Sequence, residues 1–483
     1  MARNGLGRIA ANVLSMFAND AVNRATTFVL YAMVARSLGT YEFGQMSLAL
    51  TIFYIFQVFA VAGLKTLVTR EVAKDRSRTD EYLANGSMLV SATSLLSIAA
   101  LALFVQLMGY TPETGRVILL LSLGLFPFSL SVLFEALFQA WERMHFIAYA
   151  NAAVNLLRIG GAYLVLSGGF GLDGLILLLL ASYLAVAVVE AVFLALFVAR
   201  PRFSVKPAFI LGLARAASTF LGIDGIVAIM TSFNVLLLSK LGGEREIGLF
   251  SAATQLMVPL LLFYQSMAVS VFPIMCRRFD SSFRGMRSIS EGLIALLLAI
   301  AMPSMIGLFV LAEPVLHLLY GSKGFEAAEG AVRIMVWSLM FTALTAALGQ
   351  VLLAGLRERV TLRIVAVDAL VGLLLGFVLI GQFGLTGAAL AALLTKAVDF
   401  VQHYLAVSRL LPNINWLALT WKPAGATILM GIYLVAIREQ ELLLTVASAA
   451  LLYGTAYLAL EIWSAGGVAR FRASLVSLRS RVG

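Results

Sequence analysis

Long apolar runs dominate this sequence and constrain its fold more than any other feature. Residues 87–109, 117–139, 175–199 and 291–312 carry few or no charged side chains over about 20 residues or more. A helix of that length crosses the ~30 Å hydrocarbon core of a bilayer. Only 12% of the 483 residues are charged, against about 25% in soluble domains. The pattern predicts an all-α polytopic membrane protein and excludes a soluble globular domain.

We expect about fourteen transmembrane helices, from apolar segments long enough to span a bilayer. The expected spans are 12–35, 44–63, 87–109, 117–139, 146–167, 175–199, 213–238, 248–272, 291–312, 331–354, 364–381, 387–408, 423–437 and 442–463. The intervals between these spans are too short to hold a soluble domain. The single cysteine, Cys276, excludes a disulfide framework and a cysteine-ligated metal cluster.

The distribution of Lys and Arg predicts the orientation. If the N-terminus is cytoplasmic, the cytoplasmic segments hold four times as many Lys and Arg residues as the outer segments. The positive-inside rule then favours both termini in the cytoplasm and an even number of crossings of a bacterial-type inner (plasma) membrane. The net charge of +10 therefore marks loops that face anionic membrane lipids, and we expect no nucleic-acid partner.

The sequence also contains an internal repeat. Asp20 aligns with Asp224 and Gly44 with Gly248, and further on Phe170-Gly-Leu-Asp-Gly174 matches Phe383-Gly-Leu-Thr-Gly387. These landmarks follow the same order in both halves. They predict two six-helix lobes, 1–206 and 207–410, followed by an extra helix pair and a basic tail in 411–483. Because each lobe has an even number of spans, the repeats are parallel, which suits alternating access. Two lobes in one chain favour a monomer.

Several short motifs resemble a known family. They are Ala35-Arg-Ser-Leu-Gly39, Glu42-Phe-Gly44, Ala62-Gly-Leu64, Thr69-Arg-Glu-Val-Ala73, and Leu319-Tyr-Gly321 with Phe325 and Ala328. Together they are similar to the oligosaccharide (Wzx-type) flippases, the polysaccharide-biosynthesis branch of the multidrug/oligosaccharidyl-lipid/polysaccharide exporter superfamily. The resemblance implies a fold shared with the multidrug exporters. It also implies outward flipping of a polyprenyl-diphosphate-linked oligosaccharide for O-antigen, capsule or exopolysaccharide, with functional coupling to a polysaccharide polymerase.

Polar side chains follow one face of several predicted spans. A charge inside the bilayer is costly, so it should face a cavity or a partner. Arginine binds diphosphate through forked hydrogen bonds, and the candidate headgroup residues are Arg24, Arg158 and Arg215, with Asn19, Asn23, Asn151 and Asn155 lining the cavity. The alternatives for the arginines are a salt bridge to Asp20 or snorkelling to the interface.

Ionisable residues inside the spans are candidates for ion coupling. Asp20 and Asp224 occupy equivalent positions in the repeat, and the other candidates are Asp368, Lys396 and Asp399. The alternatives are structural pairing between helices, and a local ion pair in the Lys396–Asp399–His403 stripe. We expect no cofactor and no metal site, and coupling to H⁺ or Na⁺ stays open.

The sequence favours transport over catalysis. Gly169-Phe-Gly-Leu-Asp-Gly174 matches a dinucleotide-binding pattern, but it joins two spans and lacks the βαβ context, which favours a tight interhelical turn. No P-loop, zinc-protease motif or nucleophile elbow is present, so we predict no catalytic residue. Two relatives in the same superfamily remain alternatives: a cation-coupled multidrug antiporter and a lipid II flippase. A membrane glycosyltransferase is a distant alternative, because no loop is long enough for its catalytic residues.

Overall fold

The computed structural model describes residues 2–198, 205–279, 283–437, 441–468 and 470. Within these ranges the chain is helical and contains no strand. By length and composition, ten helices could cross a membrane, or eleven if the bent pair Phe325–Met335 and Ser338–Ala354 is one span. The chain is therefore a multi-pass membrane protein. The expected count of about fourteen spans is not confirmed, although each expected span overlaps a helix.

The structure divides into two compact units, Met1–Gly248 and Leu249–Gly483. Helix α9, which the repeat assigns to the lobe 207–410, packs against α2, α3 and α4 in the first unit. The compact units are defined by contacts between helices. The internal repeat in the sequence instead defines the lobes 1–206 and 207–410 and the segment 411–483. The lobes stay a prediction.

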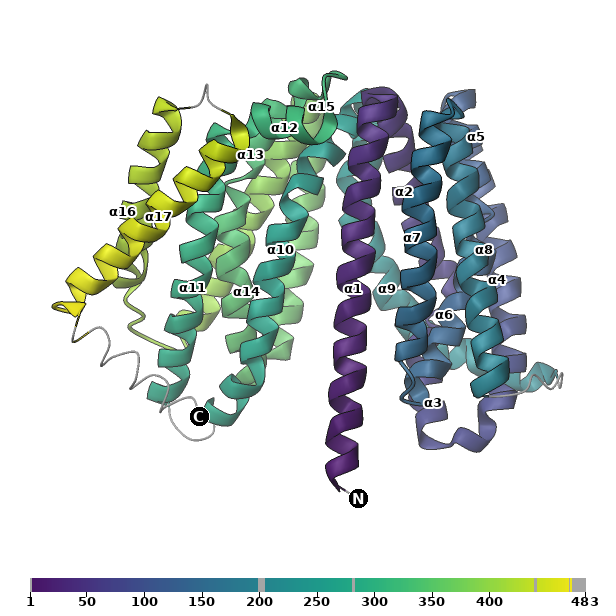
Figure 1. The fold of residues 1–483 in the computed structure, drawn as a ribbon. Helices are drawn as coiled ribbons and strands as arrows, with labels where there is room; N and C mark the ends of the chain where they lie inside the picture. The colour runs from purple at the N-terminus through teal and green to yellow at the C-terminus, as the bar shows by residue number, and fades with distance from the viewer. Residues whose placement is uncertain (1, 199–204, 280–282, 438–440, 469, 471–483) are drawn as a thin grey trace. The chain divides into compact units, whose positions relative to one another are not determined.

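The first unit is built around α2. Helix α2 packs against α4, α5, α6 and α9, and α1 runs alongside α7 (Figure 1). The helices of this unit are α1 (Ala2–Leu38), α2 (Thr40–Val61), α3 (Leu64–Lys74), the 3₁₀ helix η1 (Arg76–Arg78), α4 (Thr79–Met108), α5 (Pro112–Ser122), α6 (Leu125–Ala140), α7 (His145–Ser167), α8 (Gly171–Phe197) and α9 (Pro207–Leu241). Helix α10 (Glu244–Phe279) crosses the boundary between the units.

In the second unit, α11 packs against α14 and α16, and α16 packs against α17. Its helices are α11 (Phe283–Val310), α12 (Ala312–Tyr320), the 3₁₀ helix η2 (Phe325–Ala328), α13 (Glu329–Met335), α14 (Ser338–Ala354), α15 (Glu358–Ser408), α16 (Trp416–Ala436) and α17 (Leu442–Ser464). At the start of α16, the Asn415 side chain accepts a hydrogen bond from the Ala418 N–H and caps the helix.

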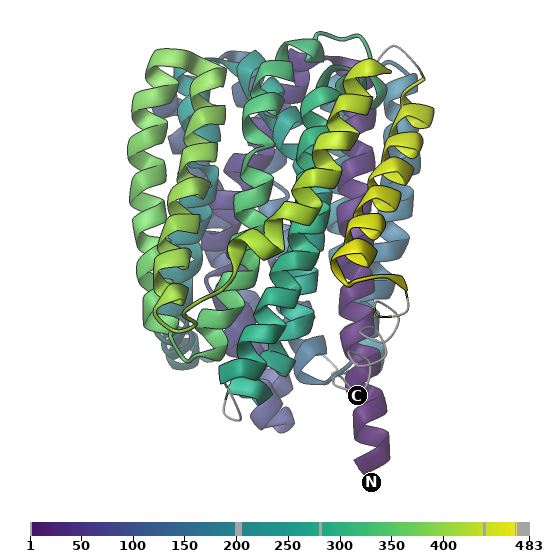
Figure 2. The same cartoon turned by 90° about the vertical axis from the view of Figure 1, so that its left-hand side faces the viewer.

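Helix α15 is a hairpin of two limbs. Its 51 residues would measure ~76 Å as one helix, more than twice the ~30 Å of a bilayer core. The backbone breaks at Gly384 (φ 52°, ψ −126°), and a Cβ on Gly387 would lie 1.9 Å from the Leu379 carbonyl oxygen. The limbs lie side by side in Figure 2.

The corresponding turn between α7 and α8 also depends on glycines at a positive φ and at a close contact. Gly171 has φ 62°, and a Cβ on Gly174 would lie 2.6 Å from the Phe170 Cβ. Both copies of the repeated motif therefore need glycine for a left-handed backbone and for close approach. The expectation of a tight interhelical turn is confirmed.

The glycines of the Ala35–Ala73 signature also serve backbone packing. Gly39 (φ 87°) precedes α2, and Gly63 (φ 69°) separates α2 from α3. A Cβ on Gly63 would lie 2.6 Å from the Leu221 N and 2.7 Å from the Ala217 carbonyl oxygen, both in the α9 backbone. These residues therefore fix breaks and close helix contacts.

Candidate functional site

The polar faces of α1 and α7 meet in the first unit. The Asn155 side-chain amide donates a hydrogen bond to the Asn23 side-chain carbonyl oxygen. Asn19 is buried, and its Oδ1 has no hydrogen-bond partner among the described residues. Asn151 is half-buried on the same stripe of α7 as Asn155. The side chain of Asp20 lies outside the described residues.

Arg158 lies one helical turn beyond Asn155 on α7. Its guanidinium carbon is 5.7 Å from the ring centroid of Tyr183 on α8, a cation–π distance. Its Nε is buried and has no hydrogen-bond partner within the described ranges. A buried N–H donor without a partner costs about 1–3 kcal/mol. Arg158 is therefore held against an aromatic face while keeping donor capacity for an anion.

An aromatic cluster supports this arginine. The Tyr183 ring stacks on Phe53 of α2 at 5.2 Å with an interplanar angle of 5°. Phe128 of α6 meets both rings edge-on, at 5.7 Å from Phe53 and 5.8 Å from Tyr183. Aromatic residues of three helices, α2, α6 and α8, thus fix the position of the ring that faces Arg158.

A cavity of about 260 Å³ opens beside this cluster, within the first unit. Helices α2, α3, α6 and α9 contribute its walls, and its polar lining residues include Gln57, Lys65 and Asp224. Phe128 also lines it and so joins the cavity to the aromatic cluster. Asp224, predicted as a coupling residue, lies at this cavity.

The other two predicted arginines differ from Arg158 in burial. Arg24 on α1 and Arg215 on α9 are exposed. Their exposed side chains are free to reach an interface or a ligand, and their role stays a prediction.

A buried carboxylate escaped the sequence analysis. Glu190 in α8 has none of its surface exposed, and Ser131 of α6 donates a hydrogen bond to it. Glu135, one turn beyond Ser131, pairs with Lys65 of α3 at 2.7 Å. The signal that could have found Glu190 is an acidic residue in the middle of the apolar run 175–199.

The second unit holds a separate polar cluster in the α15 hairpin. Asp399 is buried, and its carboxylate lies 3.3 Å from the Lys396 Nζ and 2.8 Å from the His403 Nδ1. On the other limb, Asp368 accepts a hydrogen bond from the Gln402 amide at 2.8 Å. The local Lys396–Asp399–His403 ion pair is therefore present, and Asp368 joins the same cluster. Among the described residues, no group of His, Cys, Asp or Glu side chains is arranged to hold a metal ion.

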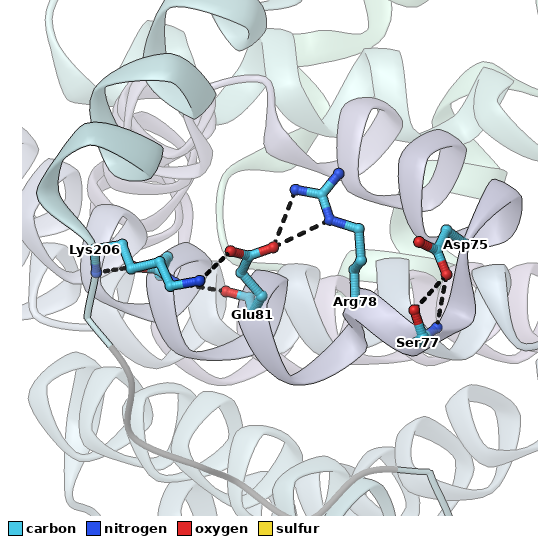
Figure 3. A network of polar contacts seen from close by, with 6 residues as sticks. Asp75, Ser77, Arg78, Glu81 and Lys206 are labelled. Atoms are coloured by element: carbon cyan, nitrogen blue, oxygen red, sulfur yellow. Dashed lines mark hydrogen bonds and ion pairs between the residues drawn. The ribbon is translucent and has the colours of Figure 1, made fainter.

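A polar network fixes the start of α9 against α4 (Figure 3). Glu81 pairs with Lys206 at 2.9 Å and with Arg78 at 3.0 Å. The Lys206 backbone N–H donates to the Asn85 side-chain oxygen at 2.7 Å. Asp75 accepts from the Ser77 N–H and hydroxyl, and these bonds hold the pKa of Asp75 below its usual value. The network ties the α3–α4 connection to the entry of α9.

The fold and the intramembrane polar groups define a multi-pass membrane transporter. The chain belongs to the polysaccharide biosynthesis protein family, whose model matches residues 9–279. It is 22% identical over 397 residues to the probable low-salt glycan biosynthesis flippase Agl15 of Haloferax volcanii, covering 82% of both chains. It is also 22% identical to the capsular polysaccharide biosynthesis protein CapF of Staphylococcus aureus, covering 80% of this chain and 96% of CapF.

Solved structures show the same fold. The lipid II flippase MurJ, in an inward closed conformation, superimposes with a TM-score of 0.73 at 15% identity, covering 92% of this chain and 98% of MurJ. An inward-facing multidrug resistance MATE family transporter gives a TM-score of 0.65 at 15% identity, covering 80% of this chain and 94% of that chain. The expected fold class is confirmed, as is the resemblance to the flippase family and its superfamily.

Proposed function

We propose that this protein flips a polyprenyl-diphosphate-linked oligosaccharide from the inner to the outer leaflet of a bacterial-type inner membrane, with both termini cytoplasmic. Membership of the polysaccharide biosynthesis family supports this function, as do relatives named as a flippase and a capsule biosynthesis protein. The chain transports and performs no chemistry on its substrate. It works as a monomer, without a cofactor, and supplies a polysaccharide polymerase with flipped substrate.

The observation that supports the proposal most directly is the position of Arg158 and the unsatisfied hydrogen-bonding capacity of its side chain. Its guanidinium is held over Tyr183, and its buried Nε lacks a partner among the described residues. A forked donor of this kind matches the oxygens of a phosphate group, as a diphosphate supplies. Asn19 and Asn23 on α1 and Asn151 and Asn155 on α7 supply neutral donors and acceptors. Arg24 and Arg215 add cationic charge.

Ion coupling forms part of the same proposal. Asp224 lies at the first-unit cavity, and Asp368, Lys396 and Asp399 form the cluster of α15. Asp20 belongs to this set as the repeat partner of Asp224. Carboxylates inside a membrane are suited to H⁺ or Na⁺ binding during alternating access.

The test is a deletion strain scored for surface polysaccharide and for polyprenyl-linked oligosaccharide. Without the protein, we expect polysaccharide to disappear and the lipid-linked intermediate to accumulate in the inner leaflet. Wild type should restore export, and Arg158→Ala should not, at equal expression. Arg116→Ala is the matched control, because Arg116 is an exposed arginine paired with Asp173, and it should rescue fully.

Two other outcomes would overturn the assignment. Normal polysaccharide with sensitivity to cationic drugs would indicate a multidrug antiporter. Lysis with normal polysaccharide precursors would indicate a lipid II flippase.

A further inference from the structure

Glu190 is a fully buried acid with half of its carboxyl group unsatisfied. It lies in the interior of α8 with none of its surface exposed. Ser131 donates a hydrogen bond to Oε2. Oε1 is buried and has no hydrogen-bond partner in the described part of the chain. An ionised carboxylate in this position leaves a charge-bearing oxygen unsolvated, which is a large free-energy cost.

The segment of α8 that holds Glu190 packs against a buried hydrophobic cluster, through Ala191, Phe193 and Leu194. This cluster is formed mainly by α3, α4 and α6, and it includes Leu133 and Leu137 of α6. The charged groups that act on Glu190 are Glu135 of α6 and Lys65 of α3. Helices α5 and α7 also pack on α8. Their acidic and basic residues are Glu113 and Arg116 on α5 and His145 and Arg158 on α7; in the described part of the chain, the side chain that bonds to Glu190 is Ser131.

Lys65 links this buried acid to the cavity. Its Nζ lies 2.7 Å from the Glu135 carboxylate, and its side chain is 41% exposed and lines the cavity of about 260 Å³. Glu135 is only 17% exposed. Among the described residues, the Lys65 amine is therefore the ion-pair partner of Glu135. The side chain of the same lysine also forms part of the cavity wall.

We propose that Glu190, Ser131, Glu135 and Lys65 form a proton-binding site whose occupancy is linked through Lys65 to an anion in the cavity. The link to an anion rests on the proposed function. A proton binds at the free Oε1 of Glu190 and converts the carboxylate to a neutral acid. When a diphosphate oxygen draws the Lys65 amine away from Glu135, two carboxylates remain in apolar surroundings, and uptake of one proton relieves their repulsion. When the anion leaves, Lys65 returns to Glu135 and the proton is released.

The donor set favours a proton over a metal ion. Ca²⁺ needs six or more oxygen ligands and Mg²⁺ needs an octahedral shell. Two carboxylates and one hydroxyl supply too few oxygens, and the Lys65 amine would repel a cation. A single unsatisfied oxygen suits a single proton.

The test is an infrared pH titration of the purified full-length protein in lipid bilayers. Wild type should show the carbonyl stretching band of a protonated carboxylic acid shielded from water. Glu190→Gln should abolish that band, because glutamine is isosteric and has no acid proton. Asp173→Asn is the matched control on the same helix, with an exposed carboxylate paired to Arg116, and should leave the band intact. Asp368 and Asp399 can contribute bands of their own, so the readout is the difference spectrum of wild type minus Glu190→Gln. A difference spectrum without this band overturns the proposal.

Ser131→Ala gives a second measurement if Glu190→Gln is poorly folded. Loss of the hydroxyl that donates to Oε2 should shift the frequency of the band, and an unchanged band in folded Ser131→Ala overturns the proposal. Lys65→Gln should move the titration midpoint of the band upward by about one pH unit, because a neighbouring cation is lost. If the titration midpoint of the band is the same in Lys65→Gln as in wild type, the proposed link between Lys65 and the proton site is wrong.

Geranyl diphosphate then tests the link to the cavity, with geraniol as the neutral control. The diphosphate should raise the amount of protonated acid at fixed pH in wild type but not in Lys65→Gln. No change in wild type overturns the anion link, whether or not the deletion strain loses polysaccharide. Conversely, a failed flipping assay with an intact, diphosphate-sensitive band would reject the proposed function and leave the proton site standing.

Discussion

Gly44 at the start of α2 and Gly248 at the start of α10 lie backbone against backbone, and they are equivalent positions of the internal repeat. A Cβ on Gly44 would lie 1.7 Å from the Glu244 carbonyl oxygen and 3.0 Å from the Gly248 N. A Cβ on Gly248 would lie 2.2 Å from the Thr40 carbonyl oxygen. The two helix starts can approach this closely only because both residues lack a side chain.

Gly44→Ala and Gly248→Ala should each destabilise the protein. The new methyl group meets backbone that cannot rotate away, and overpacking of this kind costs about 1–3 kcal/mol or more. Thermal unfolding in detergent measures the loss. Gly212→Ala is the control, because a Cβ there meets nothing within 4 Å, and it should leave the unfolding temperature nearly unchanged. Equal effects of the three substitutions would contradict the close contact.

Tyr183→Phe should keep the flipping rate of the wild type, whereas Tyr183→Leu should lower it. Phenylalanine keeps the ring that faces Arg158 and stacks on Phe53, whereas leucine removes it. A partly desolvated cation–π contact contributes about 0.5–2 kcal/mol, so we expect a several-fold loss of flipping rate for leucine only. Reconstituted vesicles with a fluorescent polyprenyl-diphosphate oligosaccharide give the rate. If both variants lose activity equally, the hydroxyl and not the ring is the important group.

Asn23 and Asn155 should show energetic coupling. Their side chains are hydrogen-bonded between α1 and α7, and interhelical hydrogen bonds in membranes contribute about 0.6–2 kcal/mol. A double-mutant cycle with Asn23→Ala and Asn155→Ala, followed by unfolding in detergent, measures this term. The double variant should be less destabilised than the sum of the single variants. Strict additivity would show that the bond is not formed in the membrane.

Asn85→Ala should destabilise the protein more than Lys206→Ala. Asn85 is fully buried and accepts from the Lys206 backbone N–H while donating to the Glu81 carbonyl oxygen at 2.8 Å. Losing it leaves buried polar groups unpaired, at about 1–3 kcal/mol. Lys206→Ala removes a partly exposed ion pair with Glu81, which contributes at most about 1 kcal/mol. Chemical denaturation ranks the two variants, and the reverse order would refute this account of the network.

Outward flipping should accelerate when the membrane potential is negative inside. Moving one charge through 100 mV changes its free energy by ~2.3 kcal/mol, so a diphosphate with about two negative charges gains ~4.6 kcal/mol if the empty carrier returns neutrally. Oriented vesicles with a potassium diffusion potential and valinomycin test this. A rate that ignores the potential but falls when a proton gradient is dissipated would show that coupling, and not the potential, drives transport.

The sequence predicted most of what depends on local pattern. The apolar spans overlap helices, and the repeated Phe-Gly-Leu motifs form turns at Gly171 and Gly384. Asn155 and Arg158 share one stripe because their spacing is one helical turn. Their partners, Asn23 and Tyr183, lie on other helices, and no periodicity within α7 identifies them. Glu190 is visible in the sequence as an acidic residue within the apolar run 175–199, but its full burial and its hydrogen bond from Ser131 depend on packing against another helix.

The hairpin of α15 also bears on how the chain enters the membrane. Its second limb carries Lys396, Asp399 and His403, and each ionisable side chain adds an insertion cost, about 2.5–3.5 kcal/mol for Lys or Asp at the bilayer centre. Asp368 precedes them on the first limb, and Gln402 joins the limbs by a hydrogen bond. The partners of these groups are therefore synthesised within one segment of 51 residues. We expect the translocon to release both limbs together, as a preassembled hairpin whose charges are already matched when they first meet lipid.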